Sequence, residues 1–437
     1  MKKQCNRNKL KTKACKRESL IHRVQSLSEI CFQICATRKR RVIFSIVSAF
    51  VIFWLCYFMD NSEPFAALDR SDLCYFIEKT LPEHSRRDFY DSVFFVNTSR
   101  DRQIVCLNTP LDTSLYQVGN TDITDRKMLL DFLNMMDTVD YKFLIIDLTF
   151  DKRHKTEYDK ALFDKMLKMR NIIIADKVDT INCYEIADKR LQRIARLSDY
   201  NSYFGDQSFS RYAFLQKKEH SIPMEINYRL FGKDIHKLFF LPIYYSKAHL
   251  CMNAPKLRIH GEFKRGELKV DPNVCGDLGF SFVNADKRDL NADLSGKYVI
   301  VTDISQDVHD TYLGKAPGGY IVYEALRFLE NDHHVLKWRH VFLTILVFSL
   351  VLLFLFWTHY GMPFDALSKK KSRLSAVVKW LVTNGILYLF YLIVYLKFSF
   401  IYNIVIPMTY VTIVAFVISK SKQYEKNLSN SNPAAVA

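Results

Sequence analysis

The feature that most constrains this chain is a set of long apolar segments that contain almost no charged residue and are bordered by clusters of Lys and Arg. The first segment runs from Val42 to Met59, directly after four basic residues at 38–41, and the others follow residue 340. A helix rises about 1.5 Å per residue, so about 20 apolar residues cross the ~30 Å hydrocarbon core of a bilayer. The sequence therefore predicts four membrane spans, at residues 42–59, 341–357, 376–396 and 400–418.

The chain has a net charge of +16, and the location of this charge indicates its role. Residues 1–41 carry +11 and residues 358–437 carry +7, whereas residues 60–357 carry only −2. A nucleic-acid-binding protein would carry its basic groups on the folded domain, so no nucleic-acid partner is expected. Lys and Arg beside apolar segments mark the cytoplasmic side of a membrane. The lipid bilayer is therefore the expected partner, with both termini in the cytoplasm and residues 60–340 outside it.

Two segments before the outer domain allow alternative interpretations. A cleaved signal peptide is the alternative for residues 42–59, but the basic leader is long for one and Trp54 and Phe58 make a bulky cleavage region. We therefore expect an uncleaved anchor. A predicted helix in residues 18–36 has an apolar face made of Leu20, Val24, Leu27, Cys31 and Ile34. Such a helix either lies on the inner leaflet or docks onto a partner protein or a second copy of the chain.

Residues 60–340 alternate between short apolar runs and amphipathic helical patterns. The apolar runs have the length of buried strands and lie at residues 92–97, 141–148, 171–175 and 297–303. Helical periodicity is present at residues 124–136, where Thr124 is the expected N-cap, and at 159–169 and 319–330. Apolar strands that alternate with helices are typical of α/β domains. The sequence thus predicts an α/β fold with a largely parallel sheet, although residues 201–293 are too irregular to order.

The predicted organisation is completed by the segments on the cytoplasmic side. These are the basic segment with its amphipathic helix (1–41), a basic loop between the second and third spans (358–375) and a tail after the fourth (419–437).

Three passages of the outer domain resemble, in order, one family of sensory domains. They are FFVNTSRD at Phe94–Asp101, a long passage at Ile123–Ala175 that includes YKFLIIDLTFD, and LSGKYVIVTDISQDVHDTYLGKAPGG at Leu294–Gly319. These passages are similar to the second type of CHASE domain, the cyclase- and histidine-kinase-associated sensory extracellular domain. The resemblance extends over residues 42–419, because such domains follow an N-terminal anchor and precede a group of closing spans.

The resemblance implies a multi-pass protein of the bacterial inner membrane that presents a ligand- or stimulus-binding domain outside the cytoplasm. Members of the family usually carry a cyclase or kinase domain after the last span, but here only residues 419–437 follow it. A segment of this length is too short to fold into a catalytic domain. We therefore expect a free-standing sensory protein that is not an enzyme and that signals through a separate partner.

The densest polar cluster of the outer domain follows its last predicted strand and consists of Asp303, Asp307, His309 and Asp310. The corresponding place after an earlier strand is held by Asp147, Asp151 and His154. Ligands favour the crevice beyond the carboxyl ends of parallel strands, and carboxylates with His bind metal ions. The residues expected to bind a ligand are therefore Asp147, Asp303, Asp307, His309 and Asp310.

Other interpretations of these residues stay open. In a solvated loop the same side chains would only hydrogen-bond the local backbone. The alternative function is an extracytoplasmic metal-dependent hydrolase that uses both acidic loops. The residue types in these loops do not identify a particular metal ion or cofactor. Five cysteines fall in the outer domain, where they either form disulfides or pack as small buried side chains: Cys74, Cys106, Cys183, Cys251 and Cys275.

Overall fold

The computed structural model describes residues 29, 33–62, 90–106, 120–176, 185–198, 208–209, 211–216, 219–255, 257, 274–283, 290–311, 314–360, 385–387, 389, 393 and 405–431. The chain divides into two compact units. The larger unit is formed mainly by Asp60–Leu336, and the smaller unit contains the helical segments before and after it in the sequence.

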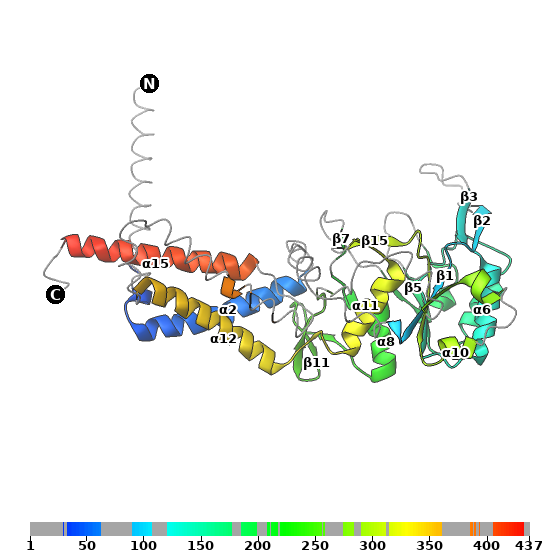
Figure 1. Cartoon of the computed structure of the whole chain (residues 1–437), viewed down its shortest axis with the longest axis horizontal. Coiled ribbons are helices and arrows are strands. Elements are labelled where there is room, and N and C mark those ends of the chain that lie inside the picture. The colour runs from blue at the N-terminus through cyan, green and yellow to red at the C-terminus, as the bar shows by residue number, and fades with distance from the viewer. Residues whose placement is uncertain are drawn as a thin grey trace, which may run out of the picture. The chain divides into compact units, whose positions relative to one another are not determined.

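A six-stranded parallel sheet forms the centre of the larger unit (Figure 1). Its strand order is β13-β1-β14-β4-β5-β6, and every neighbouring pair is parallel. The strands are β1 (Val93–Asn97), β4 (Phe143–Ile146), β5 (Ile172–Asp176), β6 (Ala195–Leu197), β13 (Cys275–Asp277) and β14 (Tyr298–Thr302). The predicted α/β fold with a largely parallel sheet is confirmed, and all four predicted strands belong to this sheet. Strand β13 comes from the stretch that the sequence pattern leaves unordered.

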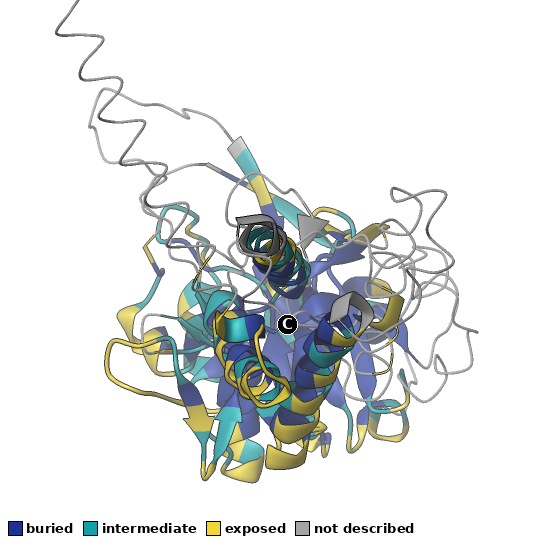
Figure 2. Cartoon of the chain, turned by 90° about the vertical axis from the view of Figure 1, so that its left-hand side faces the viewer, coloured by how far each residue is buried: buried dark blue, intermediate teal, exposed yellow. Residues whose placement is uncertain are grey.

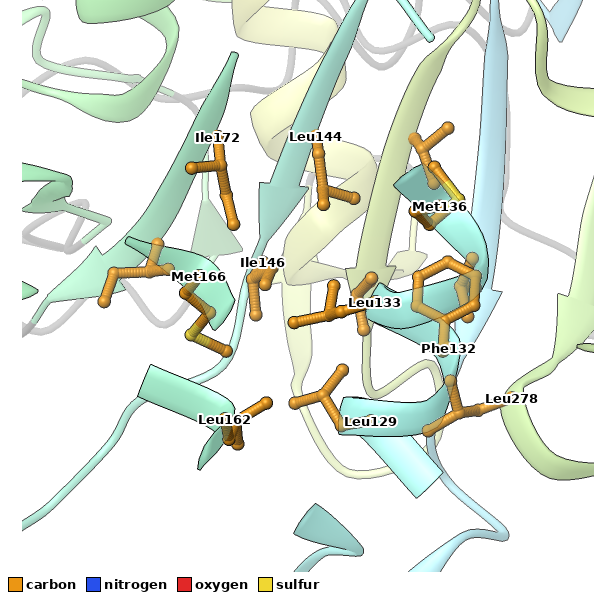
Figure 3. Close-up of a cluster of buried hydrophobic side chains, with 14 of the residues drawn as sticks. Leu129, Phe132, Leu133, Met136, Leu144, Ile146, Leu162, Met166, Ile172 and Leu278 are labelled. Carbon is orange, nitrogen blue, oxygen red and sulfur yellow. The ribbon is translucent and has the colours of Figure 1, made fainter. Parts of the chain in front are cut away.

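The central strands are apolar at successive positions, and both of their faces are buried. Strands β1, β4 and β14 are buried throughout, and Figure 2 colours the interior of the domain accordingly. One face packs against α6 (Arg126–Met135), α7 (Asp159–Met166) and α10 (Leu290–Leu294). In Figure 3, Leu133 of α6 lies beside Ile146 of β4 within this cluster. Full burial of a side chain of this size is worth about 1.5–3 kcal/mol, so this cluster is a main source of the domain's stability.

The opposite face is covered by α8 (Ile222–Phe231) and α11 (Gly318–Glu330), which pack against each other. Aromatic rings make much of the contact with the sheet. The ring centroid of Phe95 in β1 lies 6.4 Å from that of Tyr320 and 6.3 Å from that of Tyr323. Tyr298 in β14 lies 6.2 Å from Tyr323. The domain therefore has three layers, with helices on both faces of a buried sheet.

Helix α6 begins one residue later than the sequence pattern predicts. The expected cap Thr124 is the last residue of β3 (Asn120–Thr124), which pairs with β2 (Arg102–Cys106). Asp125 caps α6 instead, and its side chain accepts a hydrogen bond from the Met128 amide at 2.9 Å. Thr124 remains paired with Arg102 of β2, and the neighbouring acidic residue is an equally good cap. The other two predicted helices are confirmed as α7 and α11.

Smaller sheets complete the larger unit. A four-stranded antiparallel sheet consists, in order, of β10 (His236–Lys237), β11 (Tyr244–Ser246), β12 (His249–Cys251) and β17 (Val335–Leu336). A three-stranded mixed sheet consists, in order, of β16 (Gly314–Pro317), β15 (Val308–Thr311) and β7 (Ser208–Phe209), with β15 antiparallel to β16 and parallel to β7. A two-stranded ribbon joins β8 (Leu215–Gln216) to β9 (Glu219–His220). Short helical turns are η1 (Met136–Thr138), η2 (Lys189–Arg193) and the π-helical η3 (Leu278–Val283).

Three long helices lie mainly in the smaller unit: α2 (Arg38–Asn61), α12 (Trp338–Tyr360) and α15 (Val405–Ser431). Within the part of the chain that the structure describes, two helical segments are long and apolar enough to cross a bilayer, Arg38–Asn61 and Trp338–Trp357. They coincide with the first two predicted spans.

The third and fourth predicted spans are not among these two helices. The third span, at residues 376–396, lies largely outside the described residues, and the fourth, at 400–418, overlaps α15, which is not one of the two candidates. Anchoring by four helices therefore stays a prediction. The predicted amphipathic helix at residues 18–36 also lies largely outside the described residues, as do Cys74 and Cys183.

Candidate functional site

The carboxyl end of the central sheet contains the point at which the chain's connections change face. Strand β1 is followed by α6 on one face, whereas its neighbour β14 leads to α11 on the other face. Strand β4, on the far side of β14, is followed by α7 on the α6 face. Parallel α/β sheets bind ligands at such a switch point, because the connecting segments diverge there. A ligand-binding site is therefore expected at the ends of β1, β14 and β4.

Polar side chains form a row across the ends of these strands on the α11 face. The row consists of Asp277, Asn97, Thr302 and Asp147, and the strand register pairs Asn97 with both Asp277 and Thr302. Asn97 Nδ2 donates a hydrogen bond to Asp277 Oδ1 at 2.6 Å, and the Thr302 hydroxyl donates to Asp147 Oδ2 at 3.5 Å. Asn97 and Thr302 are fully buried, and Asp147 is 8% exposed. Hydrogen bonding along the row offsets the cost of burying these groups.

Helix α11 begins directly on this row, and two glycines allow its close approach. A Cβ atom on Gly319 would lie 2.8 Å from the Cβ of Thr302, which is closer than two carbon atoms pack. A Cβ atom on Gly318 would overlap the Asp307 carboxylate and would lie 3.1 Å from Asp147 Oδ2. The first turn of α11 therefore faces two carboxylates, and the positive end of the helix dipole stabilises them.

Asp303 leaves this row and lies toward the opposite face of the sheet, because successive strand residues point to opposite sides. Its Oδ1 accepts hydrogen bonds from the amides of Ser305 and Gln306, both at 2.9 Å. Its Oδ2 accepts a hydrogen bond from Arg102 Nη1 at 2.7 Å, and the side chain is only 6% exposed. The carboxylate is thus engaged by partners within the domain.

Arg102 is the centre of a polar network that the sequence pattern does not single out. Besides Asp303, its guanidinium binds Asp122 Oδ2 at 3.0 Å and Gln306 Oε1 at 2.9 Å. Arg102 is the first residue of β2, and Asp122 lies on the partner strand β3. The network therefore ties the β2–β3 hairpin to the end of β14.

Asp307 and His309 form a partly exposed pair next to the start of α11. His309 Nε2 lies 3.1 Å from Asp307 Oδ1, and the two side chains are 36% and 41% exposed. Asp310 follows on β15 and is exposed on the other face of that strand. Of the five residues predicted to bind a ligand, the structure brings Asp147 and Asp307 together at Gly318, with His309 beside them. Asp303 and Asp310 point elsewhere.

The acidic loop after β4 is tied within itself. Arg153 Nε lies 3.0 and 2.9 Å from the two carboxylate oxygens of Asp151, which is 4% exposed. Burial lowers the pKa of the neighbouring His154 and so favours its neutral form. Asp151 also forms an isolated β-bridge with Ile186. This loop is thus held by its own arginine and by residues 185–187.

Within the described ranges, no group of three or more His, Cys, Asp or Glu side chains is arranged to hold a metal ion. Cys251 and Cys275 of the larger unit are buried. Burial raises the pKa of Cys251 to about 12, which keeps this thiol protonated. No family model, curated protein or solved structure matches this chain.

A second charged cluster lies where β6, β9 and α8 meet, and sequence reasoning missed it. The ring of His220 sits between two carboxylates, with Nδ1 3.0 Å from Glu225 Oε2 and Nε2 2.9 Å from Asp234 Oδ1. Both contacts are hydrogen bonds only when both ring nitrogens carry a proton. The bond to Glu225 raises the pKa of His220, against the opposing effect of burial.

Two arginines complete this cluster on the other side of Glu225. Arg196 Nη2 lies 3.0 Å and Arg229 Nε 2.8 Å from Glu225 Oε1. Burial opposes ionisation of Glu225, but the hydrogen bonds from His220, Arg196 and Arg229 outweigh it and lower its pKa to about 2. Only the spacing of Glu225 and Arg229, four residues apart on α8, is a signal that the sequence contains. His220 and Arg196 arrive from separate strands.

Proposed function

We propose that this chain is a membrane protein that presents its α/β domain outside the cytoplasm as a sensory domain. The observation that carries the proposal is the position of the compact unit Asp60–Leu336 between two helices that can each cross a bilayer. A folded domain between two spans is attached to the membrane at both ends. A change of shape in such a domain acts on both helices at once.

The distribution of charge supports the outside location. The +11 of residues 1–41 precedes the apolar part of α2, and the loop predicted at 358–375 contains Lys369, Lys370, Lys371 and Arg373. Basic residues next to spans favour the cytoplasmic side. The segment between the two helices is nearly neutral, as expected for a domain on the opposite side.

The finer parts of the proposal rest on the resemblance to the second type of CHASE domain. It favours a multi-pass protein of the bacterial inner membrane, with four spans and both termini in the cytoplasm. The three similar passages include strands β1, β4 and β14. We propose that the protein is not an enzyme and that a separate partner carries the signal onward.

Two of the strand-end carboxylates form ion pairs inside the domain, and this supports a sensory rather than a hydrolytic role. Asp303 is held by Arg102 and Asp151 by Arg153. Asp147 and Asp303 leave their strands toward opposite faces of the sheet. Asp151 and Asp303 are therefore committed to internal ion pairs, and a hydrolase built on both acidic loops would have to work with Asp147, Asp307 and His309.

Helix α11 gives the candidate site a covalent route to the second span. Its first turn lies on Thr302 and next to Asp147 and Asp307. After α11 the chain forms β17, and α12 begins at Trp338 after the single residue Lys337. A ligand that displaces the buried Asp147 carboxylate therefore acts on the start of α11, and shifts of about 1–2 Å are sufficient in helix-shift switches.

Reporter fusions test the proposed topology in the intact chain. An alkaline phosphatase fused after Asp60 or Lys337 should be active, because these positions end on the outside, and one fused after Lys371 or Gln423 should be inactive. A cytoplasmic reporter such as β-galactosidase should give the reverse pattern at the same four positions. Phosphatase activity after Lys371 would contradict the proposal.

Ligand binding at the candidate site has a separate test with a matched control. The purified full chain is heated with and without Mg²⁺, Ca²⁺, Mn²⁺ or Zn²⁺, and any ion that raises Tm is kept. Asp147→Ala and Asp307→Ala should abolish this increase, whereas Asp310→Ala should leave it unchanged, because Asp310 points away from the other two. Loss of the increase only in Asp310→Ala would place the ligand elsewhere, and no increase for any ion would favour the solvated-loop interpretation.

A further inference from the structure

The hairpin between β10 and β11 exposes an unusually apolar tip. Phe239 is 84% and Phe240 86% exposed, the highest values among the large apolar side chains that the structure describes. Leu238 and Leu241, on either side of them, are each 37% exposed. A contiguous exposed apolar patch of this kind marks a surface that another apolar surface covers.

The backbone of the tip is also unfavourable for its sequence. The Leu241 amide donates to the Leu238 carbonyl at 3.1 Å, so Phe239 and Phe240 are the two central residues of a tight turn. Phe239 has a φ of +47°, a conformation that glycine normally provides at this position of a hairpin turn. A bulky aromatic residue is strained there, and such strain clusters at functional positions. Local turn chemistry therefore does not account for the two phenylalanines.

The hairpin belongs to the sheet that receives both ends of the domain. Strand β17, the last element before α12, pairs with β12 through Leu336 and Leu250. At the other end of the domain's sequence, Asn61 Oδ1 accepts a hydrogen bond from the Asn253 amide at 2.7 Å, two residues after β12. The chain therefore enters and leaves the domain next to β12, and β11 is the neighbouring strand.

We propose that the tip Leu238–Leu241 contacts the outer leaflet of the bilayer in which α12 is embedded. This inference rests on the membrane anchoring proposed above. Neighbouring strands lie about 4.8 Å apart and residues about 3.3 Å, so the tip lies within about 20 Å of Leu336, two residues before the second span. Exposed Lys237 directly precedes the apolar tip, as suits a surface that meets lipid phosphates.

Strand directions determine how the hairpin would approach the bilayer. Strand β17 is parallel to β11, because both are antiparallel to β12. The chain therefore leaves β17 for α12 at the end of the sheet opposite to the tip. For the tip to contact lipid, the strands of this small sheet lie along the bilayer surface. Phe239 and Phe240 then contact lipid and restrict tilting of the domain.

Photocrosslinking in the full chain tests this contact. The photoreactive residue p-benzoylphenylalanine replaces Phe240, and the protein is reconstituted into vesicles of phosphatidylethanolamine and phosphatidylglycerol. Mass spectrometry should then find lipid adducts at position 240. Phe280 provides a matched control, because it is 80% exposed but belongs to η3, which packs against α6 at the far end of the domain from β11 (Figure 1). Adducts at position 280 should be several-fold fewer than at 240.

A third position separates the two proposals. Phe342 lies in α12 and is 69% exposed, so the same probe there reports whether α12 is in the bilayer. Lipid adducts at 342 but not at 240 would overturn the contact and leave the anchoring intact. Absence of adducts at both positions would overturn both. Crosslinks from 240 to a second copy or to another part of the same chain would assign the tip to a protein interface and would also overturn the lipid contact.

Discussion

At the scale of single residues, the adjacent glycines at the start of α11 differ in what surrounds them. The obstacle next to Gly319 is the Cβ of Thr302, which is fully buried and fixed to a central strand. The obstacle next to Gly318 is the end of the Asp307 side chain, which is 41% exposed and able to move. The same chemical change should therefore have different costs at neighbouring positions.

We expect Gly319→Ala to lower the free energy of unfolding by about 1–3 kcal/mol, the usual cost of overpacking a core. Gly318→Ala should cost less than about 1 kcal/mol, because the Asp307 carboxylate can turn away and alanine favours helix. Chemical denaturation of the full chain in detergent, followed by circular dichroism, measures both. Equal losses in the two variants would show that α11 does not rest on Thr302 as described.

The His220 cluster predicts a dependence of stability on pH. A raised pKa means that the folded state holds the proton of His220 more tightly than the unfolded chain does. The resulting stabilisation is complete below about pH 6.5, the ordinary pKa of histidine, and is lost as pH rises through the higher folded-state pKa. Glu225 has the opposite sign, since its pKa of about 2 gives stabilisation that is lost only when pH falls below about 4.5.

We therefore expect Tm to fall between pH 6 and pH 9, and His220→Gln to flatten this slope because the variant has no proton to lose. Differential scanning fluorimetry over this pH range measures the wild type and the variant. If the slope were unchanged in His220→Gln, protonation of His220 would not be the cause of the pH dependence of Tm.

Single residues also mark the limit of sequence reasoning. Asp147 and Asp307 were predictable as strand-end carboxylates, and they do meet at α11. Arg102 was not, because the strand that carries it pairs with β3 and only the folded hairpin brings its guanidinium to Asp303. A sequence pattern identifies which residues end a strand, but not which distant charge will neutralise them.

At the scale of elements, the β2–β3 hairpin depends on one nearly buried ion pair. Arg102 joins it to Asp303, and the two side chains are 20% and 6% exposed. Arg102→Met would leave Asp303 buried with its charge unpaired, and loss of one partner of a buried pair costs about 3–5 kcal/mol, less for the part that water reaches. Arg100, two residues earlier, forms an ion pair with Asp277 but is 68% exposed.

Comparison of these two arginines isolates the effect of burial. Arg100→Met should cost less than about 1 kcal/mol, as exposed ion pairs do, whereas Arg102→Met should cost several times more. Urea denaturation of both variants provides the free energies of unfolding. If Arg100→Met proved as destabilising as Arg102→Met, the hairpin would not depend on the contact with Asp303.

The elements themselves were predictable where their pattern was strong. Strands β1, β4, β5 and β14 are continuous apolar runs, and α6, α7 and α11 have clear helical periodicity, so all seven follow from the sequence. Strands such as β6, β13 and β17 contain only two or three residues. They exist because a neighbouring strand offers free hydrogen-bonding groups, and such pairing leaves little trace in a local pattern.

At the scale of the whole molecule, the end of α2 is part of the folded domain. Asp60 is fully buried and lies 2.8 Å from Arg211 Nη2, and Arg211 Nη1 also donates to the Ala254 carbonyl at 2.9 Å. The adjacent Asn61 binds Asn253 just after β12, and β12 pairs with β17, which leads to α12. The first and last segments of the domain are thus joined through one strand.

This connection predicts that a destabilising substitution at Asp60, where the domain begins, also destabilises β17, where the domain ends. Asp60→Asn removes one charge of a buried pair, and a loss of about 3 kcal/mol of local stability corresponds to roughly a hundredfold faster amide exchange. Hydrogen–deuterium exchange of the full chain should rise by about this factor in peptides covering β12 and β17, and should stay unchanged in β1 and β14. Faster exchange in β12 alone would mean that the two ends move independently, and the domain would then lack the means to act on both helices together.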